Sequence, residues 1–332
     1  MARAHADWGG PDMTELAGKP RPRARRRLLV AGLVVASAAA GFLAFTSPPR
    51  LLSMMDWAVG GGAGVTRAAT GISFGSHGQR LDVWMPTASA TGRRPVLIWW
   101  YGGGWVKGDR GAYAFAGRAL AQAGYVVVIP DYRKVPQVRF PAFLQDGAEA
   151  VAWTRDNASR FGGDPGRIGF AGHSAGAYTA VMLALDEQWL RAAGVDPSIV
   201  KAAVGLSGPY DFYPFTTRRS IDAMGGAPDP LATQPIRFAR ADAPPLLLVT
   251  STLDDTVRPR NALNLTARLR ALSAPVELRN YPGQTHEDVV MALSKPFRDK
   301  APVLADMRAF LDRGLASSAT PSSPEQARAT TP

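Results

Sequence analysis

The chain has 332 residues, of which 46% are hydrophobic, and a formal net charge of +11. This length and apolar content exclude a disordered protein and allow one large domain or two small ones. Because the chain has no cysteine, disulfides, a thiolate nucleophile and cysteine-bound zinc are also excluded. Seven basic and three acidic residues lie before residue 28, and no basic helix follows, so the charge does not favour nucleic acid as a partner.

The N-terminus combines a basic block, RPRARRR at 21–27, with an uncharged apolar run at 28–45. A helix of that length spans about 27 Å, close to the hydrocarbon thickness of a bilayer. The order of charge predicts a basic cytoplasmic tail at 1–27, a transmembrane anchor at 28–45 and a periplasmic or extracellular remainder. Two alternatives stay open: a cleaved signal peptide that releases a secreted protein, since ASAAA offers an Ala-x-Ala exit, and a buried core helix.

The remainder divides into a linker at 46–66 that begins as a short amphipathic helix, a folded domain at 67–314 and a disordered tail rich in Ser, Thr and Pro at 315–332. Within the domain, apolar strand-like runs alternate with helix-like segments. This alternation predicts an α/β fold with a mostly parallel sheet covered by helices on both faces. Strands are expected at 80–86, 95–101, 125–132, 167–174, 201–208, 244–252 and 275–283, and helices at 113–123, 143–157, 175–185, 259–272 and 303–311.

The stretch GHSAG at 172–176 has the pattern Gly-x-Ser-x-Gly between an apolar strand and a helix-like segment. A nucleophile on a sharp turn from strand to helix has a strained backbone that leaves no room for bulky neighbours. The two glycines satisfy this requirement because they have no side chains. The pattern predicts Ser174 as a nucleophile. The alternative is an ordinary glycine-rich loop.

A serine nucleophile needs a base, and the chain has four histidines. His5 lies in the N-terminal tail, His77 in a polar turn, and His173 is turned away from its neighbour Ser174. His286, in a loop just after the last expected strand, remains as the base. The alternative is an ordinary surface histidine.

The base in turn needs a carboxylate to fix its tautomer. Asp254 and Asp255 follow the strong apolar strand LLLVTST and precede His286. Side chains of adjacent aspartates point in different directions, so only one of the two can orient the histidine. The order Ser, Asp, His is that of α/β-hydrolases.

The stretch YGGGW at 101–105 is expected to supply an oxyanion hole. Backbone N–H groups without neighbouring side chains can approach a developing oxyanion, which assigns donors to Gly103 and Gly104, with Ala175 as the third. Tyr101 and Trp105, which flank the glycines, are predicted to contact substrate. A phosphate loop is the rival interpretation, but the Gly-Lys-Ser/Thr ending and the Gly-x-Gly-x-x-Gly spacing are missing.

These motifs together resemble the α/β-hydrolase superfamily, and within it the carboxylesterase and hormone-sensitive-lipase-like group that includes BD-FAE-type, feruloyl-esterase-like enzymes. The resemblance covers about residues 66–313. It is carried by YGGGW, PDYR at 130–133, the run FPAFLQDGAEAVAWTRDNASRFGGDPGRIGFAGHSAGA and the segment PPLLLVTSTLDDTVRPRNA. Alignment of the last segment implies Asp254, not Asp255, as the acid. The chain departs from the family pattern at Tyr101, which replaces a histidine, and at Thr250 and Ser251, which replace His-Gly.

The resemblance implies a serine hydrolase that cleaves small carboxylic esters through an acyl-enzyme, without a metal or an organic cofactor. Ser174 attacks the ester, His286 transfers the proton and Asp254 orients His286. Two alternatives remain: a peptidase or acyltransferase with the same triad, and an inactive fold that serves as a membrane-tethered binding module.

Overall fold

The structure is a computed structural model that describes residues 46–316. The predicted tail at 1–27, the predicted anchor at 28–45 and most of the predicted C-terminal tail lie outside the described residues. Within residues 46–316, no helix is both long enough and apolar enough to cross a membrane.

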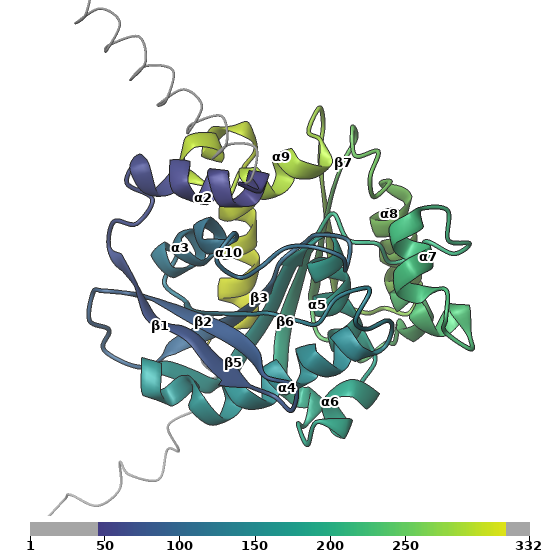
Figure 1. Cartoon of the computed structure of the whole chain (residues 1–332), viewed down its shortest axis with the longest axis horizontal. Coiled ribbons are helices and arrows are strands. Elements are labelled where there is room, and N and C mark those ends of the chain that lie inside the picture. The colour runs from purple at the N-terminus through teal and green to yellow at the C-terminus, as the bar shows by residue number, and fades with distance from the viewer. Residues whose placement is uncertain (1–45, 317–332) are drawn as a thin grey trace, which may run out of the picture. The chain divides into compact units, whose positions relative to one another are not determined.

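The described residues form an eight-stranded sheet with the order β1-β2-β4-β3-β5-β6-β7-β8 (Figure 1). β1 pairs with β2, and β2 with β4, in antiparallel fashion, while every other pair is parallel. The central strands are continuous apolar runs because helices cover both faces of the sheet. The strands are β1 (Val65–Phe74), β2 (Gln79–Pro86), β3 (Arg94–Trp100), β4 (Val126–Pro130), β5 (Gly163–His173), β6 (Val200–Leu206), β7 (Leu246–Ser251) and β8 (Val276–Tyr281).

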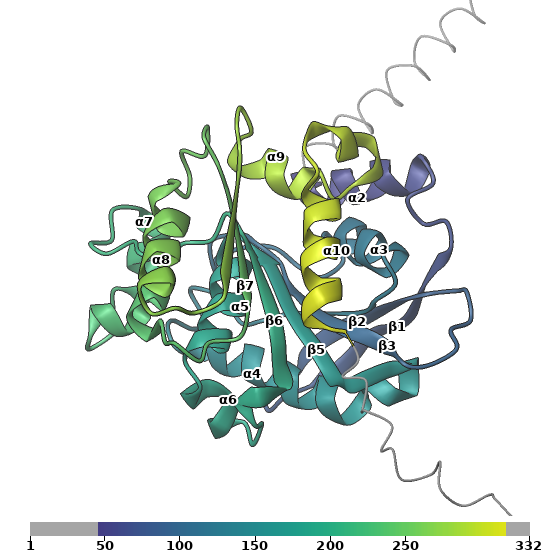
Figure 2. The same cartoon turned by 180° about the vertical axis from the view of Figure 1, so that it is seen from behind.

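The helices lie in two layers on the sheet. Figures 1 and 2 show α3 and α10 together on one face, with α4, α5 and α8 on the other. Every residue of α5 is buried, which explains why its sequence AGAYTAVMLAL is apolar all round. The α-helices are α2 (Pro48–Ala58), α3 (Ala114–Gln122), α4 (Ala142–Asn157), α5 (Ala175–Leu185), α6 (Gln188–Ala192), α7 (Arg218–Met224), α8 (Arg260–Ala271), α9 (His286–Met291) and α10 (Val303–Gly314). Short 3-10 helices are η1 (Ala158–Phe161), η2 (Pro197–Ile199), η3 (Pro230–Thr233), η4 (Pro235–Phe238) and η5 (Lys295–Lys300).

The predicted strands and long helices are all present, with ends shifted by a few residues. The sequence predicts a linker over 46–66 that begins as a short amphipathic helix, and α2 lies at that place. The strand β1, which begins at Val65, is not among the expected strands. Helix α2 buries Leu52 in the core and also makes polar contacts with the domain: the Ser53 hydroxyl donates to the Ala112 carbonyl at 2.7 Å, and Asp56 pairs with Arg118 at 2.7 Å.

Candidate active site

Ser174 lies on a sharp turn between β5 and α5, with φ 55° and ψ −123°. Its N–H donates to the Leu206 carbonyl at 2.8 Å, which ties the turn to the end of β6. A Cβ built on Gly176 would lie 2.0 Å from the Trp100 carbonyl oxygen, and one on Gly172 would lie 2.4 Å from the Gly176 carbonyl carbon. The two glycines therefore allow the turn to pack directly against the end of β3, as expected for a nucleophile elbow.

His286 and Asp254 meet beyond the ends of β7 and β8, where the His286 Nδ1 lies 2.8 Å from the Asp254 Oδ2. Both residues are buried, with 5% and 3% exposure. The other Asp254 oxygen accepts the backbone N–H groups of Thr256 and Val257 at 3.1 and 2.7 Å. Asp255 is exposed, and its carboxylate contacts only the Thr256 hydroxyl at 3.4 Å. Of the two adjacent aspartates, Asp254 is thus the one that contacts the histidine.

The tautomer of His286 follows from this contact. Because a carboxylate oxygen accepts hydrogen bonds, the Nδ1 of His286 carries the proton, and the neutral ring has its lone pair on Nε2. The sequence places His286 in a loop, whereas the structure makes it the first residue of α9. Thr285 and Asp288 form a capping box at this N-terminus, which fixes the position of the histidine backbone.

His173 is buried against His286, with ring centroids 4.7 Å apart. Its Nε2 lies 3.1 Å from the His286 carbonyl oxygen and donates to it. The Nδ1 of His173 has no partner within the described residues. Burial, reinforced by the neighbouring His286, lowers the pKa of His173 well below its ordinary value of 6.5. His173 is therefore a neutral residue that supports His286 from below the elbow, as the sequence predicts.

Replacement of His173 by glutamine, which keeps a donor for the His286 carbonyl, should reduce the acid sensitivity of the fold. In the unfolded chain His173 binds a proton below pH 6.5, but in the folded chain it does not. The contribution of His173 to the free energy of unfolding is therefore complete above pH 6.5 and is lost as the pH falls below that value. At one pH unit below 6.5 this costs about 1.4 kcal/mol of the free energy of unfolding. Urea unfolding of both proteins, well above pH 6.5 and at one pH unit below it, measures this loss of the free energy of unfolding. Equal losses in the two proteins would contradict the assignment of His173 as neutral in the folded chain.

The glycine loop lies beside Ser174. A Cβ built on Gly102 would be 3.1 Å from the Ser174 Cβ. Gly103 and Gly104 have φ 139° and 60°, a region that favours glycine. The Gly103 carbonyl accepts the N–H groups of Val106 and Lys107, both at 3.2 Å, and so closes a turn. The structure therefore brings the predicted loop and the predicted nucleophile together.

The N–H groups predicted as oxyanion donors lie in the glycine loop and at the start of α5. Within residues 46–316, the N–H groups of Gly103 and Gly104 have no acceptor in the protein. Ala175 is the first residue of α5, so its N–H has no partner inside the helix. The three groups predicted as oxyanion donors therefore have no acceptor among these contacts.

Tyr101, which the sequence predicts to contact substrate, is fully buried below the loop. Its hydroxyl donates to Asp131 at 2.8 Å and accepts from the Lys134 ammonium at 3.0 Å. Its ring stacks on Tyr132 and Tyr113 at centroid distances of 4.8 and 5.6 Å. Burial, with the charges of Tyr132 and Asp131, raises the pKa of Tyr101 well above 10, so the phenol stays protonated and donates. The side chain offers no exposed surface to a substrate, and its contacts support the loop instead.

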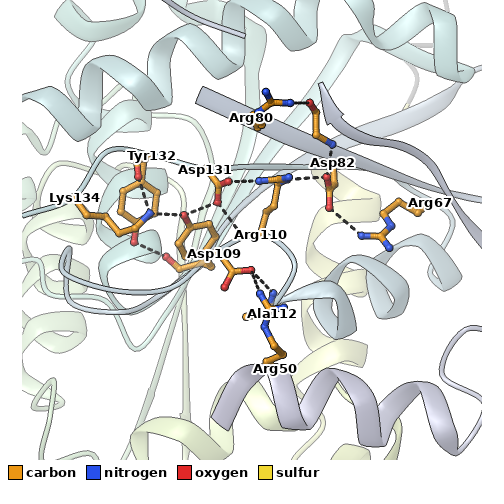
Figure 3. Close-up of polar contacts among 12 residues, drawn as sticks. Arg50, Arg67, Arg80, Asp82, Asp109, Arg110, Ala112, Asp131, Tyr132 and Lys134 are labelled. Atoms are coloured by element: carbon orange, nitrogen blue, oxygen red, sulfur yellow. Dashed lines mark hydrogen bonds and ion pairs between the residues drawn. The ribbon is translucent and has the colours of Figure 1, made fainter. Parts of the chain in front are cut away.

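The support extends through a row of alternating charges, shown in Figure 3. Asp131 also accepts the Arg110 backbone N–H at 2.9 Å and pairs with the Arg110 guanidinium, which reaches Asp82 at 2.8 Å. The Tyr132 hydroxyl donates to the Tyr101 carbonyl at 3.1 Å. Tyr101 thus replaces the histidine of the family pattern by joining the glycine loop to β4 and β2. Only the three-dimensional contacts reveal these partners.

Trp105 ends the glycine loop in a left-handed conformation, with φ 61°. Its ring lies against Tyr178, Phe143 and Phe212 at centroid distances of 5.3, 6.0 and 6.1 Å. Phe212 belongs to the loop between β6 and α7. These rings form an aromatic cluster beside the glycine loop, in which Trp105 is only 4% exposed and Phe212 is the partly exposed member.

One group of residues has the donor types of a metal site. His77, Asp146 and Glu149 have ligand atoms within 4.8 Å of one another. Asp146, however, pairs with the Arg133 guanidinium at 2.7 Å and also accepts from Gln79 at 2.7 Å. An arginine already occupies the buried carboxylate, so the cluster is better described as an ion-pair network between β2 and α4.

Comparison with known proteins agrees with this architecture. The family model described as BD-FAE matches residues 81–269, more than half of the chain. Esterase LipC of Mycobacterium tuberculosis is 35% identical over 232 residues, which cover 63% of this chain and 56% of the relative. A probable isoprenylcysteine alpha-carbonyl methylesterase of Arabidopsis thaliana is 31% identical over 243 residues, 66% of this chain and 57% of the relative. The chain thus spans little more than half the length of these relatives.

Solved structures show the same fold at lower sequence identity. The thermostable carboxylesterase EstE1, cloned from a metagenomic library, superposes with a TM-score of 0.66 at 21% identity, covering 81% of this chain and 98% of its own. An esterase of Pyrobaculum calidifontis gives 0.65 at 23% identity, with 80% and 92% covered. The chain therefore belongs to the BD-FAE family and has the α/β-hydrolase fold.

Proposed function

We propose that the protein is a carboxylesterase that cleaves small carboxylic esters through an acyl-enzyme. The observation that carries this proposal is the buried 2.8 Å contact between Asp254, which follows β7, and His286, which follows β8 and packs against His173 beside Ser174. The names of the BD-FAE relatives support the same chemistry.

In the proposed reaction, the Nε2 of His286 takes the proton of the Ser174 hydroxyl as the oxygen attacks the ester carbonyl. The imidazolium that forms is stabilised by Asp254, whose other oxygen accepts the N–H groups of Thr256 and Val257. His286 then protonates the departing alcohol. Water attacks the acyl-enzyme with His286 again as base, which releases the acid and restores Ser174.

The N–H groups of Gly103, Gly104 and Ala175 are the proposed donors to the oxyanion of the tetrahedral intermediate. They face charge that develops only as the serine attacks, so they stabilise the transition state more than the bound ester. Tyr101 is proposed as a positioning residue that holds this loop, because its side chain is buried in the network with Asp131 and Lys134.

The aromatic cluster at Trp105 and Phe212 is the proposed contact surface for the apolar part of the ester. Helix α7 borders it: a Cβ built on Gly104 would lie 2.7 Å from the Arg219 Cδ.

We also propose that residues 28–45 anchor the protein in a membrane, with the hydrolase domain on the periplasmic or extracellular side. The support is the uncharged run itself and the basic block before it. Secretion after cleavage of the segment is the alternative.

Labelling with a fluorophosphonate probe tests the esterase proposal, because the probe phosphonylates an activated serine. The unaltered protein should be labelled, and Ser174→Ala should not. Ser207→Ala is a matched control, since Ser207 is also buried, has a positive φ of 49° and follows the neighbouring strand β6. A folded unaltered protein that takes no label would disprove the proposal and favour an inactive binding module. Comparison of p-nitrophenyl esters with aminoacyl substrates separates an esterase from a peptidase.

A further inference from the structure

Helix α2 has its polar and apolar faces reversed relative to a helix that covers a water-soluble domain. Ser53 and Asp56 are buried, with 6% and 1% exposure. The opposite side carries large apolar side chains in water. Their exposed fractions are 46% for Met54, 42% for Met55, 70% for Trp57 and 49% for Val59.

The contacts of the buried face fix this orientation. The Asp56 carboxylate pairs with the Arg118 guanidinium, and both side chains are at most 6% exposed. The second Asp56 oxygen accepts the backbone N–H of Lys295 at 2.7 Å, and the Ser53 hydroxyl accepts the Phe115 N–H at 3.1 Å. A rotation that buried the apolar side chains would leave Arg118 as an unpaired buried charge, which is strongly unfavourable. The apolar face therefore stays outward.

Basic groups border this face. The Arg50 side chain at the start of α2 is 54% exposed and pairs with the exposed Asp109 carboxylate at 2.9 Å. Lys295 is exposed near the other end, where its ammonium lies 3.2 Å from a Cβ built on Gly60. Apolar side chains with a basic rim are the composition of a helix that lies in the interface of a bilayer, with its cations near anionic headgroups.

The position of α2 in the chain indicates that a lipid bilayer covers its outer face. The uncharged run ends at Phe45 and α2 begins at Pro48, so two residues separate them. Two extended residues reach only about 7 Å. If the run spans a bilayer, α2 begins within the headgroup region, the depth at which tryptophan is enriched.

We propose that the outer face of α2, formed by Met54, Met55 and Trp57 and continued by Val59 in the turn that follows, docks onto the lipid bilayer and orients the domain on the membrane. Figures 1 and 2 both show α2 and α9 at the same end of the domain, and η5, which follows α9, provides the Lys295 contact to Asp56. Docking therefore holds the end of the domain that carries α9, whose first residue is His286, beside the membrane. The inference rests on the outward face of α2 and on the proposed membrane anchor at 28–45, and it does not depend on the esterase activity.

The absence of cysteine in this chain makes a direct test possible, because one introduced thiol can be labelled uniquely. Trp57→Cys and the control Leu263→Cys are prepared in the full-length chain. Leu263 lies on α8 with a similar exposed apolar side chain, at 46%. Each variant is labelled with an environment-sensitive nitrobenzoxadiazole dye and reconstituted into vesicles of phosphatidylcholine and phosphatidylglycerol, with and without spin-labelled lipid.

The dye at position 57 should shift to shorter wavelength in vesicles and lose most of its emission to spin-labelled lipid. The dye at position 263 should do neither. Equal, water-like emission at both positions would overturn the proposal. A blue shift at position 57 without quenching by lipid would also overturn it, because a second copy of the chain or another segment would then cover the face. Thermal unfolding of both variants confirms that they are folded.

Discussion

Replacement of Asp254 by asparagine should lower kcat for a p-nitrophenyl ester by about 10⁴-fold, with little change in KM. The asparagine amide can donate an N–H to the Nδ1 of His286, which favours the tautomer with the ring proton on Nε2, and it cannot stabilise the imidazolium. The loss appears in kcat because the imidazolium exists only during the reaction.

Asp255→Asn is the matched control, because it makes the same chemical change one residue away on an exposed side chain. Its kcat should equal that of the unaltered protein. If Asp255→Asn caused the larger loss, the carboxylate that serves His286 in solution would not be the one within 2.8 Å of it in the structure.

Replacement of Gly103 by alanine should lower kcat by about 10²- to 10³-fold, as expected when an oxyanion donor is displaced. Gly103 has φ 139°, and an added Cβ would lie 2.1 Å from the backbone oxygen of Lys107. Backbone cannot yield as a flexible side chain does, so the turn must open. The N–H groups of Gly103 and Gly104 then leave their positions beside Ser174.

Kinetics with a short-chain p-nitrophenyl ester and a fluorophosphonate labelling rate measure this effect. Gly92→Ala is the control, since Gly92 is exposed and a Cβ there has no neighbour within 4 Å. A folded Gly103→Ala protein with unchanged kcat would show that this loop does not stabilise the oxyanion.

Several features of the fold could be predicted because they depend on residues that are close together in the sequence. The apolar runs of β3, β4 and β7 are buried on both faces of the sheet, and their composition alone indicates this. The elbow at Ser174 is predictable for the same reason, because the glycines that relieve its crowding are two residues away on each side. The prediction missed the short helix α9 and the strand β1.

The contacts between distant segments could not be predicted in this way. The sequence by itself narrowed the acid to two adjacent aspartates, and the resemblance favoured one of them. Only the fold shows that Asp254 meets His286, 32 residues away, while Asp255 faces water. Tyr101 is a similar case, because its partners Asp131 and Lys134 are 30 and 33 residues distant.

The sequence alone determined the order of the central strands and long helices and the position of the elbow, because backbone conformation and apolar periodicity are local properties. The tertiary structure decided which carboxylate contacts His286, what supports the glycine loop and which face of α2 is turned to the outside. These depend on which side chains become neighbours once the sheet has formed, and on the cost of leaving a buried charge such as Arg118 without its partner.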